Sequence, residues 1–536
     1  MVINSRKKKE CVLLLLCIGC LLVLVKGHIL GKAGMVQMSV PVMSADRIEN
    51  LTQGMKKGKA SSYPLYFNGH EIAYDCVDDI YYITQNMGNH FWSGQIGSDV
   101  GRLYWQGDDF FAFFDEALEQ GHVFSLYCVD EDNETWCDYR VVFTGMPTMM
   151  IDTVNGADIG DEILAAQMQL CDLKFPGKEY LHSACQVAIR GDSSRRFDKQ
   201  GYKLVLNEKL SLLGMRTDED WILAALYDDD GLIHTKFSYD IWRDIAKDNS
   251  VKKDDGTTME FVELFCNDTY LGVYGLIERI DAKELSLKGS ENDILYKCSG
   301  YDLPDESLGW AYGLENAYGI KYPKEYDSGE WLPLKEYLEV FASEEGITDY
   351  EKARSMLNME NAIDHNIFTI LSYGHDNYLR KNTFYLAEWG GKKNPGYTMI
   401  KIPWDCNVTW GIVWRYGLEF NNTIYEPERI TDPNLWSSDM KALFRCYPDE
   451  IASLTQKRWE YLREDILDKE RLLRMLDEEF AYLHGSGAYD RNYRLWPNGT
   501  EYWDDSYIYE YVEGRLEYLD VYFQDPYLDE VPALDY

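Results

Sequence analysis

The chain has 536 residues, an apolar fraction of 46% and a formal net charge of -38 at pH 7. This length predicts two or three domains with ample room for a hydrophobic core, and the apolar fraction excludes a disordered chain. The strong negative charge excludes nucleic acid as a partner, because phosphate backbones are bound by clustered Lys and Arg side chains.

The first 34 residues are typical of a targeting segment. Residues 6–9 (RKKK) precede an apolar run over residues 11–25, which is long enough for the core of a signal peptide and short for a spanning helix. No small-x-small cleavage site follows, so two outcomes stay open: a cleaved signal peptide, or an uncleaved signal anchor that holds the protein to a membrane. In both cases we expect the rest of the chain to lie outside the cytoplasm, secreted or at the cell surface.

Twelve cysteines are present, and three of them lie in the targeting segment. The others form no CxxC pair, so we expect no zinc site built from paired thiolates. Two pairs are candidate disulfides, Cys128 with Cys137 and Cys171 with Cys185. We expect several of the remaining cysteines to be small buried apolar residues.

Residues 35–145 are predicted to form a small all-β accessory domain. Aromatic and β-branched runs such as IYYIT, GRLYWQG and YRVVFTG recur between Gly, Asn and Asp residues, a pattern typical of short strands. Aromatic side chains of such a domain either bind sugars or fill its core, and we favour the core.

Residues 146–536 are predicted to form the main domain, and its first distinctive feature is a polar loop. Two strands, QVAIR and YKLVL, flank Gly191, Ser193 and Ser194. Backbone N–H groups of a Gly-Ser loop between strands can bind phosphates, and Lys203 in the second strand would reach the same phosphates. Further on, the pattern predicts a helix at residues 234–246, a hairpin turned at residues 267–268, and mainly helices after residue 411.

Residues 371–411 carry the strongest functional pattern. Asp376 lies in a polar loop that follows an apolar, helical run, and two strands are expected at residues 383–388 and 398–403. A hairpin brings the start of its first strand beside the end of its second. Asp376 and Asn382 are therefore expected close to Asp405 and Asn407.

Two carboxylates and two amides in one place suit a hard cation such as Mg²⁺ or Mn²⁺, which prefers oxygen ligands. The order of a loop Asp, an Asn, a hairpin and a second Asp is also the order of the catalytic and metal-binding groups in protein kinases. The alternative is that Asp376 and Asn377 cap a turn and that Asp405 ends a strand, as Asp and Asn commonly do.

Six stretches of the main domain carry a family resemblance: IRGDSSRRFDKQGYKLVL, EKLSLLGM, DWILAALYDDDGLIHTKFSYDIWRDI, NDTYLGVYGLIERID, GHDNYLRKNTFYLAE and IPWDCNVTWG. In this order they resemble the CotH family of secreted, kinase-like proteins, which are known from spore coats and cell surfaces. The resemblance extends from about residue 145 to the C-terminus and implies an α+β fold with a divergent protein-kinase-like domain. It also implies phosphoryl transfer from ATP to Ser or Thr of extracytoplasmic proteins with Ser/Thr-rich segments, and spore-coat proteins would be among the candidate substrates.

The resemblance also assigns roles to individual residues. It places the loop of Gly191, Ser193 and Ser194 over the phosphates of ATP and brings Lys203 to the α- and β-phosphates. Asp376 would orient the substrate hydroxyl and accept its proton.

The remaining roles concern the metal. The resemblance makes Asn382, Asp405 and Asn407 ligands of Mg²⁺ or Mn²⁺. The family commonly reads Trp-Asp-x-Asp where this chain has Trp-Asp-Cys-Asn at residues 404–407, so Asn407 offers a neutral oxygen in place of a carboxylate.

Two other functions compete with an active kinase. The first is a catalytically impaired kinase-fold module that binds surface or coat proteins, which the Asn407 departure favours. The second is an acid/base glycosidase that uses Asp376 and Asp405 as its two carboxyl groups. We rank the glycosidase last because that reaction gives no function to Lys203 or to the Gly-Ser loop.

Overall fold

The structure is a computed structural model. It describes residues 40–60, 63–85, 87, 94–107, 114–191, 193–229, 231–287, 292–300, 314–315, 317–341, 347–374, 376–377, 381–412, 436–497 and 505–526. The targeting segment expected at residues 1–34 lies outside these residues. Within the described residues, no helix is both long enough and apolar enough to cross a membrane.

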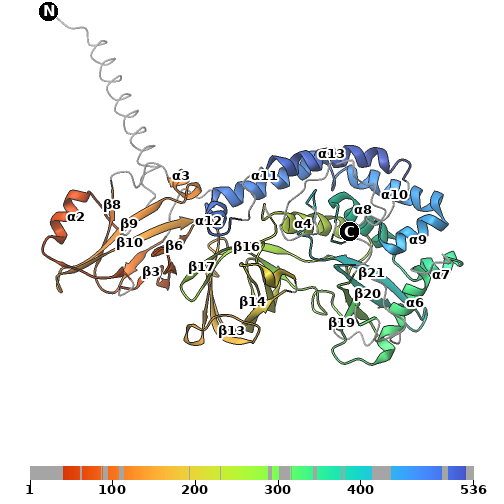
Figure 1. Ribbon diagram of the computed structural model, residues 1–536, viewed down its shortest axis with the longest axis horizontal. Helices are drawn as coiled ribbons and strands as arrows, with labels where there is room; N and C mark the ends of the chain where they lie inside the picture. Colours follow the sequence, from red (N-terminus) through yellow and green to blue (C-terminus); the bar gives the residue numbers. More distant parts are fainter. Residues whose placement is uncertain are drawn as a thin grey trace, which may run out of the picture.

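The described chain is a mixture of helices and strands, consistent with α+β, in three parts that follow one another along the long axis of the molecule (Figure 1). The first part is rich in strands, with one sheet in the order β1-β8-β9-β10-β6-β5, β2 paired to β10, and a small sheet β4-β3-β7. Two helices, α2 and α3, belong to the same part, so it is not purely β as expected from the sequence. Its elements are β1 (Val42–Met43), α2 (Ala45–Thr52), β2 (Lys56–Lys57), β3 (Leu65–Phe67), β4 (His70–Glu71), β5 (Ala73–Asp75), β6 (Ile80–Thr84), β7 (Ile96–Ser98), β8 (Arg102–Gln106), α3 (Phe114–Glu119), β9 (Val123–Asp130) and β10 (Thr135–Thr144).

The aromatic side chains of this first part fill its core, as the sequence analysis favoured. Trp105, Tyr139 and Phe143 are almost fully buried and belong to one hydrophobic cluster. Alternation along β10 directs Tyr139, Val141 and Phe143 to the same face of the sheet, because successive side chains of a strand point to opposite faces.

The second part is a closed barrel of seven strands in the order β11-β12-β13-β14-β15-β17-β16. Helix α4 leaves the barrel after β15 and contacts β16. The predicted hairpin between residues 259 and 278 is present, and Asn267 and Asp268 both adopt the positive φ angles of its tight turn. The elements are β11 (Thr148–Thr153), η2 (Val154–Gly156), β12 (Leu164–Cys171), β13 (Tyr180–Arg190), η3 (Ser193–Arg196), β14 (Gly201–Ser211), β15 (Thr217–Ala224), α4 (His234–Asp248), β16 (Met259–Cys266) and β17 (Thr269–Glu278).

The third part packs helices around a four-stranded sheet in the order β19-β18-β20-β21. Helices α11 and α13 run along one side of the molecule and reach back towards the barrel (Figure 1). The elements are β18 (Ile294–Cys298), β19 (Tyr318–Tyr322), η5 (Ser328–Trp331), α6 (Leu332–Phe341), α7 (Tyr350–Ser355), α8 (Met359–Ser372), β20 (Thr383–Trp389), β21 (Tyr397–Pro403), α9 (Ser438–Cys446), α10 (Pro448–Arg463), α11 (Lys469–Gly485), α12 (Ala488–Leu495) and α13 (Ser506–Tyr522).

A buried ion pair joins the three parts. Arg491 of α12 donates two parallel hydrogen bonds to the carboxylate of Glu263 in β16, at 2.9 and 3.0 Å. The hydroxyl of Tyr270 also donates to Glu263 at 2.6 Å, and the Arg491 guanidinium lies 5.7 Å from the ring centroid of Tyr82 in β6. The C-terminal helices are thereby fixed to both the barrel and the first sheet.

The described cysteines are free thiols. Cys128 and Cys137 lie directly opposite each other in β9 and β10, yet no disulfide joins them. The other predicted pair is wrong for a geometric reason. Cys171 lies opposite Tyr180, and Cys185 lies opposite Ala166, which is five residues from Cys171 along β12. Five residues of a strand span roughly 16 Å, whereas a disulfide joins Cα atoms at most about 7 Å apart.

Candidate active site

The hairpin expected around residues 383–403 is present, and it brings both ends of the functional stretch together. Strands β20 and β21 pair from Thr383 opposite Pro403 to Trp389 opposite Tyr397. The backbone N–H of Trp404 then donates to the carbonyl of Asn382 at 2.8 Å. Residues 382 and 404 are therefore direct neighbours, although 22 positions separate them in the sequence.

Helix α8 ends directly before the loop that contains Asp376, and so positions this loop. The Asn358 side chain caps its N-terminus, and its C-terminus ends at Tyr373 in a left-handed conformation. Asn361 fixes the helix to the hairpin: its Nδ2 donates to the Lys401 carbonyl at 2.9 Å, and its Oδ1 accepts from the Lys401 backbone N–H at 2.7 Å. The Asp376 loop therefore starts at a fixed position relative to β21.

Asn377 clamps the two ends of the hairpin. Its Nδ2 donates to the carbonyl of Trp404 at 2.6 Å and approaches the carbonyl of Asn382 at 3.4 Å. The side chain is buried, and its Oδ1 accepts no hydrogen bond within the described chain. Asn377 therefore does more than cap a turn, which is the alternative role that the sequence indicates for it.

Asp376 contacts two of its neighbours directly. Lys381 Nζ lies 2.5 Å from Asp376 Oδ1, and Asn382 Nδ2 donates to Asp376 Oδ2 at 2.9 Å. The carboxylate therefore has a fixed orientation, and the residue predicted as the proton acceptor touches one of the predicted metal ligands.

Asp405 follows Trp404 in a strained backbone conformation. Its φ angle is 58°, and Asn382 has a φ of 51°, a region that costs a non-glycine residue on the order of 1–3 kcal/mol and is common at functional sites. The side chain of Asp405 is exposed, and its backbone N–H donates to the hydroxyl of Tyr239 in α4 at 3.3 Å.

Asn407 contacts an acid that the sequence analysis missed. Its Nδ2 donates to Asp228 Oδ2 at 2.7 Å, and Asp228 lies in the segment between β15 and α4. Burial raises the pKa of Asp228 to about 7, and the negative charge of Asp405 adds to the increase. A carboxyl group with so large a shift beside other polar groups is itself a sign of a functional site.

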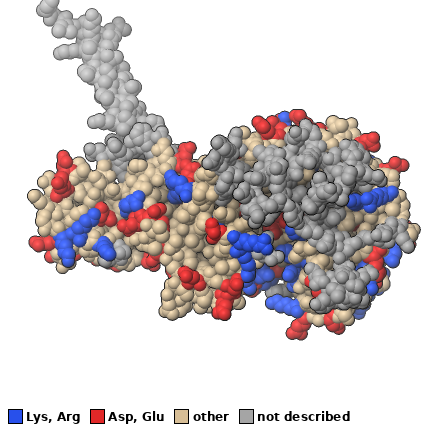
Figure 2. Space-filling model, viewed as in Figure 1, with Lys and Arg blue, Asp and Glu red and all other residues tan. Residues whose placement is uncertain are grey.

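Two cations lie near Trp404 at the contact of the barrel with the third part. The guanidinium of Arg190, at the end of β13, is 5.8 Å from the ring centroid, and Lys297 Nζ of β18 is 5.5 Å from it. Burial lowers the pKa of Lys297 to about 8, against the opposing effect of Asp405. Arg279 and Lys321 add positive charge near Arg190, and Figure 2 shows Lys and Arg gathered at this contact.

The Gly-Ser loop begins directly after Arg190. Gly191 has a φ of 122°, and a Cβ there would lie 2.1 Å from Ser194 Oγ, so the position requires glycine. Its carbonyl accepts a hydrogen bond from Arg195 Nε at 2.7 Å. Ser193 and Ser194 start the short helix η3.

Lys203 lies on the outer face of the barrel. It is opposite Ala188 in β13 and Ile222 in β15, whereas its neighbours Tyr202 and Leu204 point into the barrel core. Ile222 belongs to the hydrophobic cluster of the third part. Since Arg190 is two residues from Ala188 along β13, Lys203 and Arg190 share the face that meets that part.

The donor set around the hairpin fits a hard cation. Asp405, Asn407, Asn382 and Asp228 offer carboxylate and amide oxygens, as Mg²⁺ and Mn²⁺ require, and the buried Oδ1 of Asn377 has no partner in the described chain.

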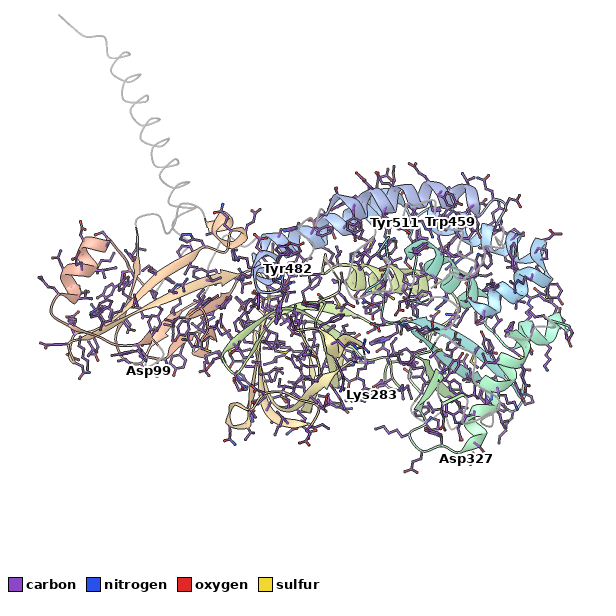
Figure 3. All side chains as sticks on the ribbon, viewed as in Figure 1. Asp99, Lys283, Asp327, Trp459, Tyr482 and Tyr511 are labelled. Carbon is purple, nitrogen blue, oxygen red and sulfur yellow. The ribbon has the colours of Figure 1, made fainter. Side chains whose placement is uncertain are left out.

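A second acidic cluster consists of Asp218, Glu219 and Asp220, whose carboxylates lie close enough together to bind one metal ion. It is a poorer candidate for a metal site because cations of the protein already occupy it. Lys283 Nζ already contacts all three carboxylates, at 2.6, 2.9 and 3.2 Å, and Figure 3 labels this lysine between the barrel and the third part. Each acid also pairs with a second cation: Arg216 with Asp218, Lys209 with Glu219 and Arg279 with Asp220. The charge of this cluster is therefore balanced by side chains without a metal.

A close contact fixes the end of the functional stretch. Gly411 has a φ of 93°, and a Cβ there would lie 2.8 Å from the ring of Tyr511, a residue of α13 labelled in Figure 3. Glycine is the residue that satisfies both conditions.

The comparison with protein families gives one match. The model of the family described as CotH kinase protein matches residues 187–519, which is more than half of the chain and includes every site residue described above. A search of the curated proteins finds no match.

Proposed function

Because the chain belongs to the CotH kinase family, we propose that it transfers the γ-phosphoryl group of ATP to Ser or Thr side chains of proteins outside the cytoplasm. The observation that carries this proposal is the meeting of Asp376 and Asn382 with Asp405 and Asn407 at one end of the β20–β21 hairpin. The cations Arg190 and Lys297 lie at the same place. Residues 146–536 would then form a divergent protein-kinase-like domain.

The cationic residues would bind the nucleotide. Phosphoryl transfer depends mainly on positioning and on neutralising the charge of the phosphates. Arg190 and Lys297 meet at Trp404, the Gly191 loop follows Arg190 directly, and Lys203 lies on the same face of the barrel. These groups provide positive charge and backbone N–H donors where the triphosphate would lie.

The oxygen donors would hold Mg²⁺ or Mn²⁺. Asn382, Asp405 and Asn407 are the proposed ligands. When bound, the metal would supply positive charge that neutralises the charge developing on the phosphates.

Asp376 would act on the substrate. In this role its carboxylate orients the Ser or Thr hydroxyl and accepts its proton. Lys381 and Asn382 hold that carboxylate in place, so it need not reorganise during the reaction.

The location and the substrate belong to the same proposal. The segment at residues 1–34 would direct the chain out of the cytoplasm and, if uncleaved, anchor it to the membrane. Ser/Thr-rich segments of surface or spore-coat proteins are the proposed substrates.

The direct test uses the full chain with labelled ATP, Mg²⁺ or Mn²⁺ and a Ser/Thr-rich peptide. We expect label on the peptide or on the protein itself, and a loss of about 100-fold or more in Asp376→Asn, the range in which a positioned acid–base group contributes. Equal labelling by the folded variant contradicts the role of Asp376.

The catalytically impaired binding module remains the second candidate, because Asn407 stands where the family commonly has an acid. A thermal-shift series with ATP and Mn²⁺ separates the two candidates. Ligand at 100 times its Kd stabilises the folded state by about 2.7 kcal/mol. A clear shift without phosphate transfer favours the binding module that retains nucleotide, and no shift at all favours a module that has lost its site.

A further inference from the structure

We propose that Asp228 is a metal-binding residue of this site and supplies the carboxylate that position 407 lacks. The inference rests on the proposed function, since it concerns the same metal. It adds a residue from a different part of the fold, the segment between β15 and α4.

The hydrogen bond between Asn407 and Asp228 is the first argument. Asn407 Nδ2 donates to Asp228 Oδ2 at 2.7 Å, so the carboxylate lies next to the amide that stands at the family's acidic position. An Asp at position 407 would bring two like charges to this distance, which is strongly unfavourable. One acid and one amide fit the two positions, and here the acid is residue 228.

The number of charges is the second argument. The family's Trp-Asp-x-Asp pattern provides two carboxylates. In this chain Asp405 and Asp228 provide two, and they flank Asn407, one in sequence and one through the hydrogen bond. In the part of the chain that the structure describes, no Lys or Arg forms an ion pair with Asp228, so no side-chain cation competes with a metal ion for this carboxyl group.

The rigidity of the surroundings is the third argument. The neighbouring Asp229 anchors the segment, because its carboxylate accepts the backbone N–H groups of His234 and Thr235 at 3.0 Å each. Ser238 of α4 accepts a hydrogen bond from Trp410 Nε1 at 2.9 Å. Hydrogen bonds thus connect helix α4 both to the segment of Asp228 and to the segment that follows β21. These bonds hold Asp228 in a fixed position, which a metal ligand requires.

The test is an exchange of the acid and the amide, measured as Mn²⁺ binding to the full chain by calorimetry without nucleotide. We expect Asp228→Asn to weaken Mn²⁺ binding by about 10- to 100-fold. The double variant Asp228→Asn with Asn407→Asp returns a carboxylate to the pair and should recover most of the affinity. Asp138→Asn, an equal change of charge at a partly exposed residue of β10 that pairs with Lys57, is the matched control and should leave binding unchanged.

Circular dichroism and the melting temperature establish that each variant is folded. If Asp228→Asn does not fold, Asp228→Ser, which removes the acid with a smaller side chain, takes its place. Unchanged Mn²⁺ affinity in a folded variant without Asp228 overturns the inference, as does a folded exchange variant that recovers nothing or a wild-type protein that binds no Mn²⁺.

The outcome is distinguishable from a failure of the proposed function, because neither ATP nor a protein substrate is present. If Mn²⁺ binding depends on Asp228 but the wild-type protein transfers no phosphate, the metal site stands and the kinase activity falls. If the wild-type protein transfers phosphate and Asp228→Asn binds Mn²⁺ normally, the proposed kinase activity stands and the inference about Asp228 is wrong.

Discussion

The pH dependence of nucleotide binding follows from the position of Lys297. Burial beside Trp404 lowers the pKa of this lysine to about 8, so its ammonium group carries a charge at pH 7 and loses most of it by pH 9. A bound phosphate raises the pKa again, because an opposite charge favours the protonated form. Nucleotide binding must therefore weaken as the pH rises through 8.

The magnitude follows from this pKa. With a pKa of about 8 in the free protein and a pKa above the tested range in the complex, the Kd for ATP at pH 9 is about tenfold higher than at pH 7. The other charged groups at this place are Arg190, Arg279, Lys321, Asp405 and Asp228. The pKa of Asp228 is about 7, so its charge changes little between pH 8 and 9, and in this interval the lysines are the groups to separate.

The assay is calorimetric titration of the full chain with ATP from pH 7 to 9.5 at constant ionic strength. Lys297→Arg is the matched variant, because Arg stays charged throughout this range and should flatten the profile. Lys321→Arg controls for the second lysine, whose pKa burial also lowers. A wild-type Kd that stays constant between pH 8 and 9.5, or an equally steep profile in Lys297→Arg, refutes the reasoning.

Two further predictions concern stability. Asn377→Ala removes the clamp on the Trp404 carbonyl and leaves a buried acceptor without a donor, which should lower the free energy of unfolding by about 1–3 kcal/mol in a urea titration; an unchanged midpoint contradicts the clamp. Arg491→Met leaves the carboxylate of Glu263 buried without its cation and should cost about 3–5 kcal/mol. The double variant with Glu263→Gln should lose less, and an equal or greater loss argues against the ion pair as the cause.

The local part of the site could be predicted from the sequence. Strand patterns on both sides of a turn-rich segment predicted that Asp376 and Asn382 lie close to Asp405 and Asn407, because a hairpin has one simple geometry. In the structure Trp404, which precedes Asp405, donates a hydrogen bond to Asn382. The helix at residues 234–246 and the hairpin turned at residues 267–268 followed from equally local signals, periodicity in one case and an Asn-Asp turn in the other.

The distant contacts could not be predicted in this way. Asn407 and Asp228 are 179 residues apart in the sequence, and Arg190 meets Trp404 only because the barrel packs against the third part. Three acids stand at residues 228–230, and Asp229 is the one whose carboxylate accepts the backbone N–H groups at the start of α4. Which of these acids contacts Asn407 after the hairpin depends on how the barrel packs against the third part, and a local sequence pattern does not predict that packing. The Cys171–Cys185 pairing failed for a similar reason, since the register of β12 and β13 separates the two thiols.

The most direct test of the central claim is phosphate transfer by the wild-type chain and by Asp405→Asn. Both proteins are incubated with labelled ATP, Mn²⁺ and a Ser/Thr-rich peptide, and Asp138→Asn serves as the control for the change of charge. The account predicts label on the peptide or on the protein itself in the wild type and the control. It predicts a loss of about 100-fold or more in Asp405→Asn, the range for losing one group that stabilises charge in the transition state. Equal transfer by a folded Asp405→Asn variant, or no transfer by any of the folded proteins, would contradict the account.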